Sequence, residues 1–135
     1  MTATQPLNAD APETRLCEMV FPEQANHYGT LFGGTALSLL GKAAFIAASR
    51  YARAAMVMRT SEKIEFRHPV HVGQLVELYA YVIREGRSSL TVEVEMTAEG
   101  LANAERSIAV KGRFEMVCVG EDGKSRPIRQ DAAAA

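Results

Sequence analysis

Apolar and polar residues alternate along most of the chain, a pattern typical of β-strands with one buried face. The alternating stretches cover residues 14–21, 56–66, 74–85, 88–98 and 103–119. Pro22 ends the first stretch, and Gly86 and Arg87 predict a turn between the third and the fourth. Gly112, within the last stretch, predicts a β-bulge.

One segment, residues 35–53, has a helical pattern and contains no aspartate or glutamate. Its length corresponds to about five helical turns. Its apolar residues spread around nearly the whole cylinder, at Ala36, Leu37, Leu39, Leu40, Ala43, Ala44, Ile46 and Ala47. A helix that is apolar on most faces is expected to be buried on most faces. Either Gly34 or Thr35 would take the capping position at its start.

One long helix followed by four strands, three of them joined by short turns, predicts an α+β fold. In this fold an antiparallel β-sheet wraps around a central helix. Residues 14–119 would form this domain, with residues 1–13 as a flexible lead and residues 120–135 as a flexible tail. A single sheet leaves one edge and part of the helix uncovered, so we expect at least a dimer.

The composition excludes several classes of protein. The chain has 135 residues, a net charge of −1 and 47% hydrophobic residues, which argues against nucleic-acid binding by bulk charge. The first residues lack the basic and apolar stretches of a signal peptide, and we expect neither a membrane span nor a membrane partner. Cys17 and Cys118 lie in strand-like stretches, which predicts buried reduced thiols and a cytoplasmic protein.

The segment just before the helix carries the candidate chemistry. It reads Asn26-His27-Tyr28-Gly29-Thr30-Leu31-Phe32-Gly33-Gly34. A glycine pair at a helix entrance presents backbone N–H groups and a positive dipole end, which suit a carbonyl oxygen or a phosphate. Together with the KAAFIAA segment at 42–48 and RHPVHVGQLVEL at 67–78, this N-x-x-G-x-x-F-G-G spacing resembles the acyl-CoA thioesterases of the hotdog fold. The resemblance covers about residues 16–119.

The resemblance implies hydrolysis of a fatty acyl-CoA to the free acid and coenzyme A, without a metal or other cofactor. It implies catalytic roles for Asn26 and for the N–H at Gly34, in a homodimer or a trimer of dimers. The residues that would contact substrate and coenzyme A are His27, Phe32, Gly33, Arg59, Thr60, Ser61, Arg87, Ser88 and Ser89. His68 and His71 have no further ligands at metal spacing, so we interpret them as structural.

Gly41 stands where this family normally has an aspartate, seven residues after the second glycine. That aspartate would act as general base or nucleophile, so its absence predicts impaired hydrolysis. Close approach of two helices across a dimer is another explanation for the glycine. Glu62 and Glu65 on the next strand are the nearest substitutes for the carboxylate. A non-catalytic acyl-CoA binding protein is the main alternative, whereas a dehydratase would need a His–carboxylate pair that the helix lacks.

Overall fold

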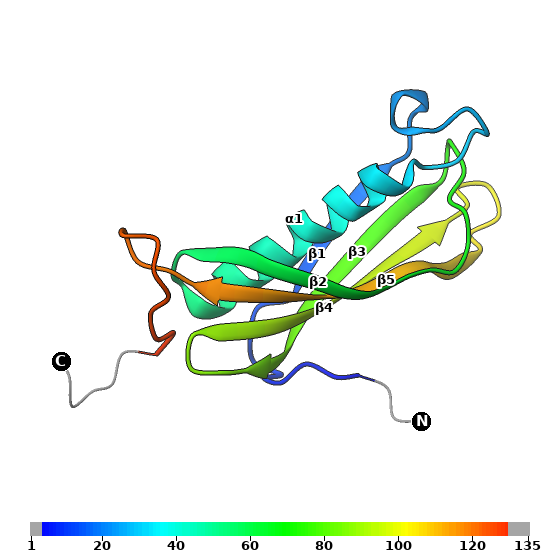
Figure 1. Cartoon of the computed structure of the whole chain (residues 1–135). Coiled ribbons are helices and arrows are strands. Elements are labelled where there is room, and N and C mark those ends of the chain that lie inside the picture. The colour runs from blue at the N-terminus through cyan, green and yellow to red at the C-terminus, as the bar shows by residue number, and fades with distance from the viewer. Residues whose placement is uncertain (1–3, 130–135) are drawn as a thin grey trace.

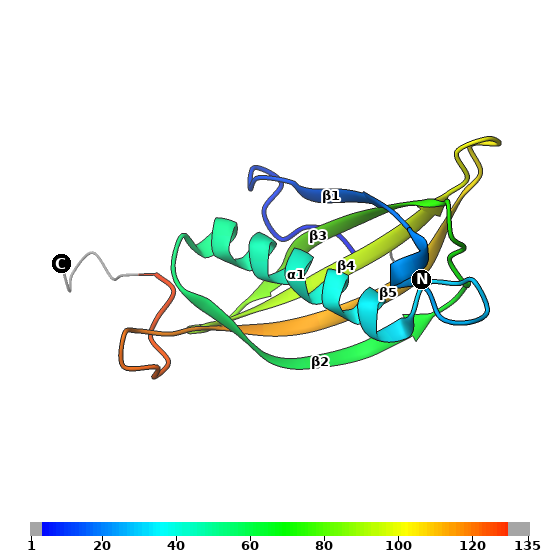
Figure 2. The ribbon, with the colours of Figure 1, turned by 90° about the horizontal axis from the view of Figure 1, so that it is seen from above.

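The computed structural model describes residues 4–129 and contains one long helix on one face of an antiparallel sheet (Figure 1). The elements are β1 (Thr14–Met19), a short 3-10 helix (Pro22–Gln24), α1 (Gly33–Ala52), β2 (Met56–Phe66), β3 (Leu75–Glu85), β4 (Ser89–Glu99) and β5 (Arg106–Cys118). The strand order is β1-β3-β4-β5-β2, so β1 and β2 are the two edges. Figure 2 shows α1 lying across the sheet between these edges. The predicted fold is confirmed.

Small side chains allow α1 to lie close to the sheet. The buried residues of the helix are Ala36, Leu39, Leu40, Ala43, Ala44, Ala47 and Ala48, and they pack on β-strand residues that include Leu78, Val94 and Phe114. The opposite stripe of the helix is open, since Leu37 is 40% exposed and Phe45 is 48% exposed. The helix is therefore not buried on most faces, because one sheet covers only one side of it.

The start of α1 differs from the prediction by one or two residues. Phe32 is the capping residue, with extended backbone (φ −63°, ψ 134°), and its side chain makes no capping hydrogen bond. Gly33 and Gly34 are therefore the first two helical residues. A Cβ on Gly34 would lie 2.7 Å from the Phe32 ring, so the glycine makes room for that ring. The helix ends at Arg53, whose left-handed backbone (φ 51°) places its N–H 2.7 Å from the Ser49 carbonyl.

The expected bulge at Gly112 lies on the neighbouring strand. The β2–β5 register shifts between Glu62 and Glu65, where Lys63 has a positive φ of 54°. Gly112 faces this bulge, and the Ile64 side chain fills the space that a side chain at 112 would need. A second shift in β2 lies between Met58 and Thr60. Both shifts of the β2–β5 pairing therefore lie in the edge strand, and Gly112 accommodates one of them. The other pairs also shift, since β3 has an extra residue between Val82 and Arg84, and β5 has one between Ile108 and Val110.

The end of the chain is held against the fold as far as the structure describes it. The Ile128 N–H donates to the Arg87 carbonyl at 2.9 Å, and Arg129 binds the Glu85 carboxylate at 2.7 and 3.0 Å. Hydrogen bonds from Arg129, and then from the Tyr51 hydroxyl, lower the pKa of Glu85 against the opposing effect of burial. Ile128 and Arg129 thus connect the segment after β5 to the end of β3 and to the turn that follows it. Residues 130–135 lie outside the described part.

The lead before β1 also has contacts with the domain. The Leu7 N–H donates to the Val82 carbonyl at 2.8 Å, and Arg50 donates to the Glu13 carbonyl at 2.6 Å. Residues 4–13 thus run along the edge of β3 beyond β1, while residues 1–3 of the expected flexible lead lie outside the described part. Of the two cysteines, Cys118 is buried as predicted, whereas Cys17 is exposed because it lies on edge strand β1. Within residues 4–129, no helix is long and apolar enough to cross a membrane.

Candidate functional site at the start of the helix

The Asn26 side chain organises the loop before α1. Its Oδ1 accepts hydrogen bonds from the Tyr28 N–H at 2.9 Å, from the Thr30 N–H at 3.2 Å and from the Thr30 hydroxyl at 3.1 Å. The two backbone donors fix the orientation of the amide, since only oxygen can accept from them. The Nδ2 group is therefore the part of Asn26 that can donate to a bound molecule.

The other loop residues of the candidate site are more exposed. The His27 ring packs against the Tyr28 ring with centroids 4.0 Å apart. Phe32 is 55% exposed and lies over Gly34. The isolated bridge between Thr30 and His71 joins the loop to the segment that follows β2. This bridge joins the segment at 26–34 to the segment at 67–78, the two motifs on either side of α1 that carry the family resemblance.

The first turn of α1 offers unpaired backbone donors. The Leu31 N–H donates to Val70 at 2.7 Å, the Phe32 N–H donates to Gln24 at 2.9 Å, and helical bonding begins with Ala36 donating to Phe32 at 3.0 Å. None of the backbone hydrogen bonds between described residues uses the N–H groups of Gly33, Gly34 or Thr35. These groups carry the positive end of the helix dipole, so they can stabilise negative charge on an oxygen placed there.

A cavity of about 330 Å³ opens beside this turn. Gly33 and Ala36 form its helix wall, and Phe66, His68 and Val70 line the opposite side. The lining is mainly apolar, with His68 and Arg67 as its charged or titratable members. Our sequence interpretation did not place Phe66, His68 or Val70 in the site. The signal available for them was their position in or beside the family-like segment at 67–78.

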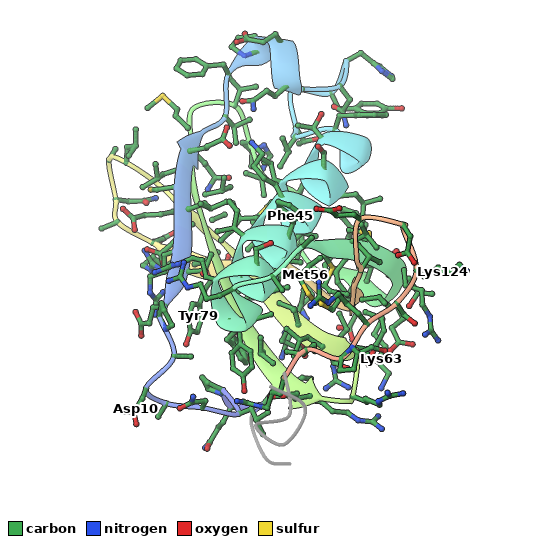
Figure 3. All side chains as sticks on the ribbon, turned by 90° about the vertical axis from the view of Figure 1, so that its left-hand side faces the viewer. Asp10, Phe45, Met56, Lys63, Tyr79 and Lys124 are labelled. Atoms are coloured by element: carbon green, nitrogen blue, oxygen red, sulfur yellow. The ribbon has the colours of Figure 1, made fainter. Side chains whose placement is uncertain are left out.

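Gly41 lies two turns further along α1, on the stripe that faces away from the sheet. Gly34, Ser38, Gly41 and Phe45 follow one another on this stripe, and Figure 3 labels Phe45 on the helix. A Cβ at Gly41 would lie 3.0 Å from the Met58 methyl carbon of β2. The Met58 side chain therefore occupies part of the space into which a residue at position 41 would extend.

The remaining candidates are not beside the helix start within one chain. Arg59, Thr60 and Ser61 are exposed on the edge strand β2, with Arg59 at a register shift. Arg87, Ser88 and Ser89 lie where β3 turns into β4, at the opposite end of the sheet (Figure 1). The N–H of Val119 on that side donates to Ala55, which follows the helix end. A 20-residue helix is about 30 Å long, so one chain does not bring the Arg87 turn to Gly33.

The two carboxylates proposed as substitutes for the aspartate have other neighbours. Glu65 forms an ion pair with Arg67 at 3.2 Å, and Glu62 lies opposite Arg113 in the strand register. Both are exposed on β2, and neither lines the cavity beside Gly33. In the described part of the chain, no group of three or more His, Cys, Asp or Glu side chains could hold a metal ion.

Comparison with known proteins gives the family. The profile of the thioesterase superfamily matches residues 28–104. An uncharacterized acyl-CoA thioester hydrolase of Zymomonas mobilis is 34% identical over 119 residues, which cover 88% of this chain and 79% of that protein. An acyl-CoA hydrolase structure from Agrobacterium tumefaciens is 41% identical with a TM-score of 0.78, covering 89% of this chain but only 46% of that longer one. A hexameric acyl-CoA thioesterase structure is 30% identical with a TM-score of 0.84, covering 90% of this chain and 81% of the other. Sequence and structure agree that this chain belongs to the thioesterase superfamily.

Proposed function

We propose that this chain hydrolyses an acyl-CoA thioester to a free acid and coenzyme A. Relatives named acyl-CoA thioester hydrolases support the reaction class. The observation that carries the proposal is the set of unpaired N–H groups at Gly33 and Gly34 beside an apolar cavity. Water attack on a thioester places negative charge on the carbonyl oxygen, and one well-placed donor stabilises that charge by about 3 kcal/mol.

In this proposal the thioester carbonyl lies at the start of α1 and the acyl chain enters the cavity beside Gly33. The Asn26 Nδ2 group donates to the thioester or to the attacking water. Phe32 and His27 would cover the thioester end of the substrate. The reaction as written uses only water and groups of the protein, so we propose no cofactor. The free thiols of Cys17 and Cys118 support a cytoplasmic location.

The proposed active unit is a dimer, or three dimers in a hexamer. Val57 and Met58 on edge strand β2 are 47% and 45% exposed, and Met58 lies beside Gly41 of α1, whose Leu37 and Phe45 are also exposed. The hexameric relative supports such an assembly. A two-fold axis near the middle of β2 would bring the partner's Arg87 end to the same end of the dimer as this chain's helix start. That arrangement would let the coenzyme A nucleotide reach the Arg87 turn.

The first prediction concerns association through β2. Val57→Lys places a charge on the exposed edge strand and should shift the protein toward smaller species. Leu101→Lys is a matched control, since Leu101 is 55% exposed in the turn between β4 and β5. Light scattering at micromolar concentration measures both variants and the parent chain. A folded monomeric parent would contradict the dimer and an active site shared between chains.

The second prediction separates the two parts of the Asn26 amide. Asn26→Asp keeps an oxygen acceptor for the Tyr28 and Thr30 N–H groups but removes the Nδ2 donor. We expect the melting temperature to stay close to that of the parent while kcat falls by about 10²–10³-fold. Asn26→Ala should lower both quantities, since it also removes the acceptor that organises the loop. Parent-like turnover in Asn26→Asp would exclude a catalytic donor at this position.

The third prediction concerns the nucleotide. Arginine suits the phosphate oxygens of coenzyme A, and Arg87→Ala keeps the backbone carbonyl that binds Ile128. Calorimetric titration with coenzyme A should show binding weakened by about 1–3 kcal/mol. Arg84→Ala is the control, because Arg84 is another exposed arginine near the end of β3. Unchanged affinity in the Arg87 variant would remove this residue from the binding site.

The fourth prediction tests the absent carboxylate. If no other residue supplies a base, Gly41→Asp should raise kcat, because a general base contributes about 10²–10⁴-fold, while affinity for coenzyme A changes little. The Met58 methyl group would have to move, which a flexible thioether allows. Gly41→Asn is the isosteric control without charge and should not raise turnover. If kcat of the Gly41→Asp variant equals that of the parent chain, another residue supplies the base.

A non-catalytic acyl-CoA binding protein is the second candidate. The observation that favours it is the Met58 side chain at the position where a carboxylate would extend from residue 41. Such a protein would bind coenzyme A in the calorimeter without releasing it from any acyl-CoA. Acetyl-, butyryl-, octanoyl- and palmitoyl-coenzyme A form a suitable panel. Chromatography should quantify the released coenzyme A, because the exposed Cys17 would react with thiol reagents.

A further inference from the structure

The cavity beside the helix start contains a base that the sequence interpretation treated as structural. We propose that the His68 imidazole acts as general base for water attack on the thioester held at Gly33. This inference rests on the proposed hydrolase function and names the group that replaces the absent helix carboxylate. It depends on three features: the lining of the cavity, the fixed backbone of His68 and the lack of a competing base.

His68 lines the same cavity as the helix start that would bind the thioester oxygen. Gly33, Phe66 and His68 all line this space of about 330 Å³. The Phe66 ring atoms would lie 3.9 Å from a Cβ on Gly33, so the chain after β2 is packed directly against the helix start.

The backbone of His68 is held while its ring is available. The His68 N–H donates to the Ala109 carbonyl at 3.2 Å, and Pro69 restricts the following backbone. The side-chain hydrogen bonds of this segment are made by Arg67 and by Gln74. Neither of them uses the His68 ring, so the bonds of residues 4–129 leave its nitrogens free to accept a proton from water.

Among the described residues, no other side chain that lines this cavity is a suitable base. Arg67 stays protonated and is paired with Glu65 at 3.2 Å. The Thr30 hydroxyl is already a donor to Asn26 at 3.1 Å. From the other elements, α1 contributes only Gly33 and Ala36, and β5 contributes Val110. Beyond the lining, Lys111 lies opposite Glu65 in the strand register, and His71 forms a bridge with Thr30.

The proposed step is balanced without any additional reactant. The His68 nitrogen takes a proton from water while the water oxygen forms a bond to the carbonyl carbon. The carbonyl oxygen becomes negative and is held by the N–H groups of the first helical turn. When the tetrahedral intermediate collapses, the C–S bond breaks and the imidazolium returns its proton to the leaving thiolate. The products are the carboxylic acid and coenzyme A.

The test is the pH profile of turnover in matched histidine variants. His68→Gln should lower kcat by about 10²–10⁴-fold, with a smaller change in KM, on the acyl-CoA panel described above. The parent should lose activity at acidic pH, where imidazoles gain a proton, and His68→Gln should lack this acidic limb. Added imidazole should restore part of the activity of His68→Ala, which a purely structural role would not allow. His71→Gln is the control, because His71 is outside the cavity lining.

Two results would overturn the proposal, and they can be told apart. Parent-like kcat and pH profile in His68→Gln would exclude His68 but leave the hydrolase function standing. A parent chain that binds coenzyme A but releases none from the panel would contradict both the hydrolase function and the base. Thermal unfolding of each variant shows whether the fold is intact. If His68→Gln does not fold, the folded His68→Ala variant is used instead. Failure of added imidazole to restore its activity would exclude His68 as the base.

Discussion

The close contact between α1 and the sheet is the constraint on which the rest of the structure depends. Ala43, Ala44 and Ala48 are fully buried, so the helix axis can approach the strands without large side chains between them. This contact uses one side of the helix and leaves the stripe through Gly34 and Gly41 open. The same contact fixes the first turn of α1 near the segment after β2. The donors and the cavity are thus consequences of how the helix is packed.

The sequence was sufficient for the elements but not for their irregular ends. Alternation gave the strands and an apolar 3.6-residue pattern gave the helix, because both patterns are local. The predicted capping residue was wrong. The Phe32 ring lies over Gly34, and residue spacing along the chain does not reveal that contact. The bulge that faces Gly112 lies in β2, whose Ile64 side chain fills the space beside the glycine, and such a contact between strands is not visible in local alternation. β5 has an extra residue of its own, between Ile108 and Val110. The Glu85–Arg129 pair joins residues far apart in sequence, a contact that the composition of the tail does not indicate.

The candidate site was predictable only where it is local. The loop from Asn26 to Gly34 is continuous in sequence, so its motif indicated the donors directly. The cavity wall from Phe66 to Val70 reaches the helix start through tertiary packing, which the sequence motif does not show. His68 was interpreted as structural because no further ligands stand at metal spacing. The Arg87 turn was grouped with the loop by resemblance, yet one chain holds them at opposite ends of the sheet. Only an assembly of several chains could bring the Arg87 turn and the loop together, and residue spacing in one chain does not reveal such an assembly.

The irregular backbone of β2 has a consequence for what can pair with this edge. A flat exposed strand is a template for any other extended chain, and that is a route to aggregation. Here the register shifts near Arg59 and Lys63 interrupt the row of backbone donors and acceptors. A regular foreign strand would meet these interruptions and lose hydrogen bonds at each of them. A second copy of β2 would carry the same interruptions in reverse order. The bulges therefore disfavour continuous pairing of β2 with a regular foreign strand.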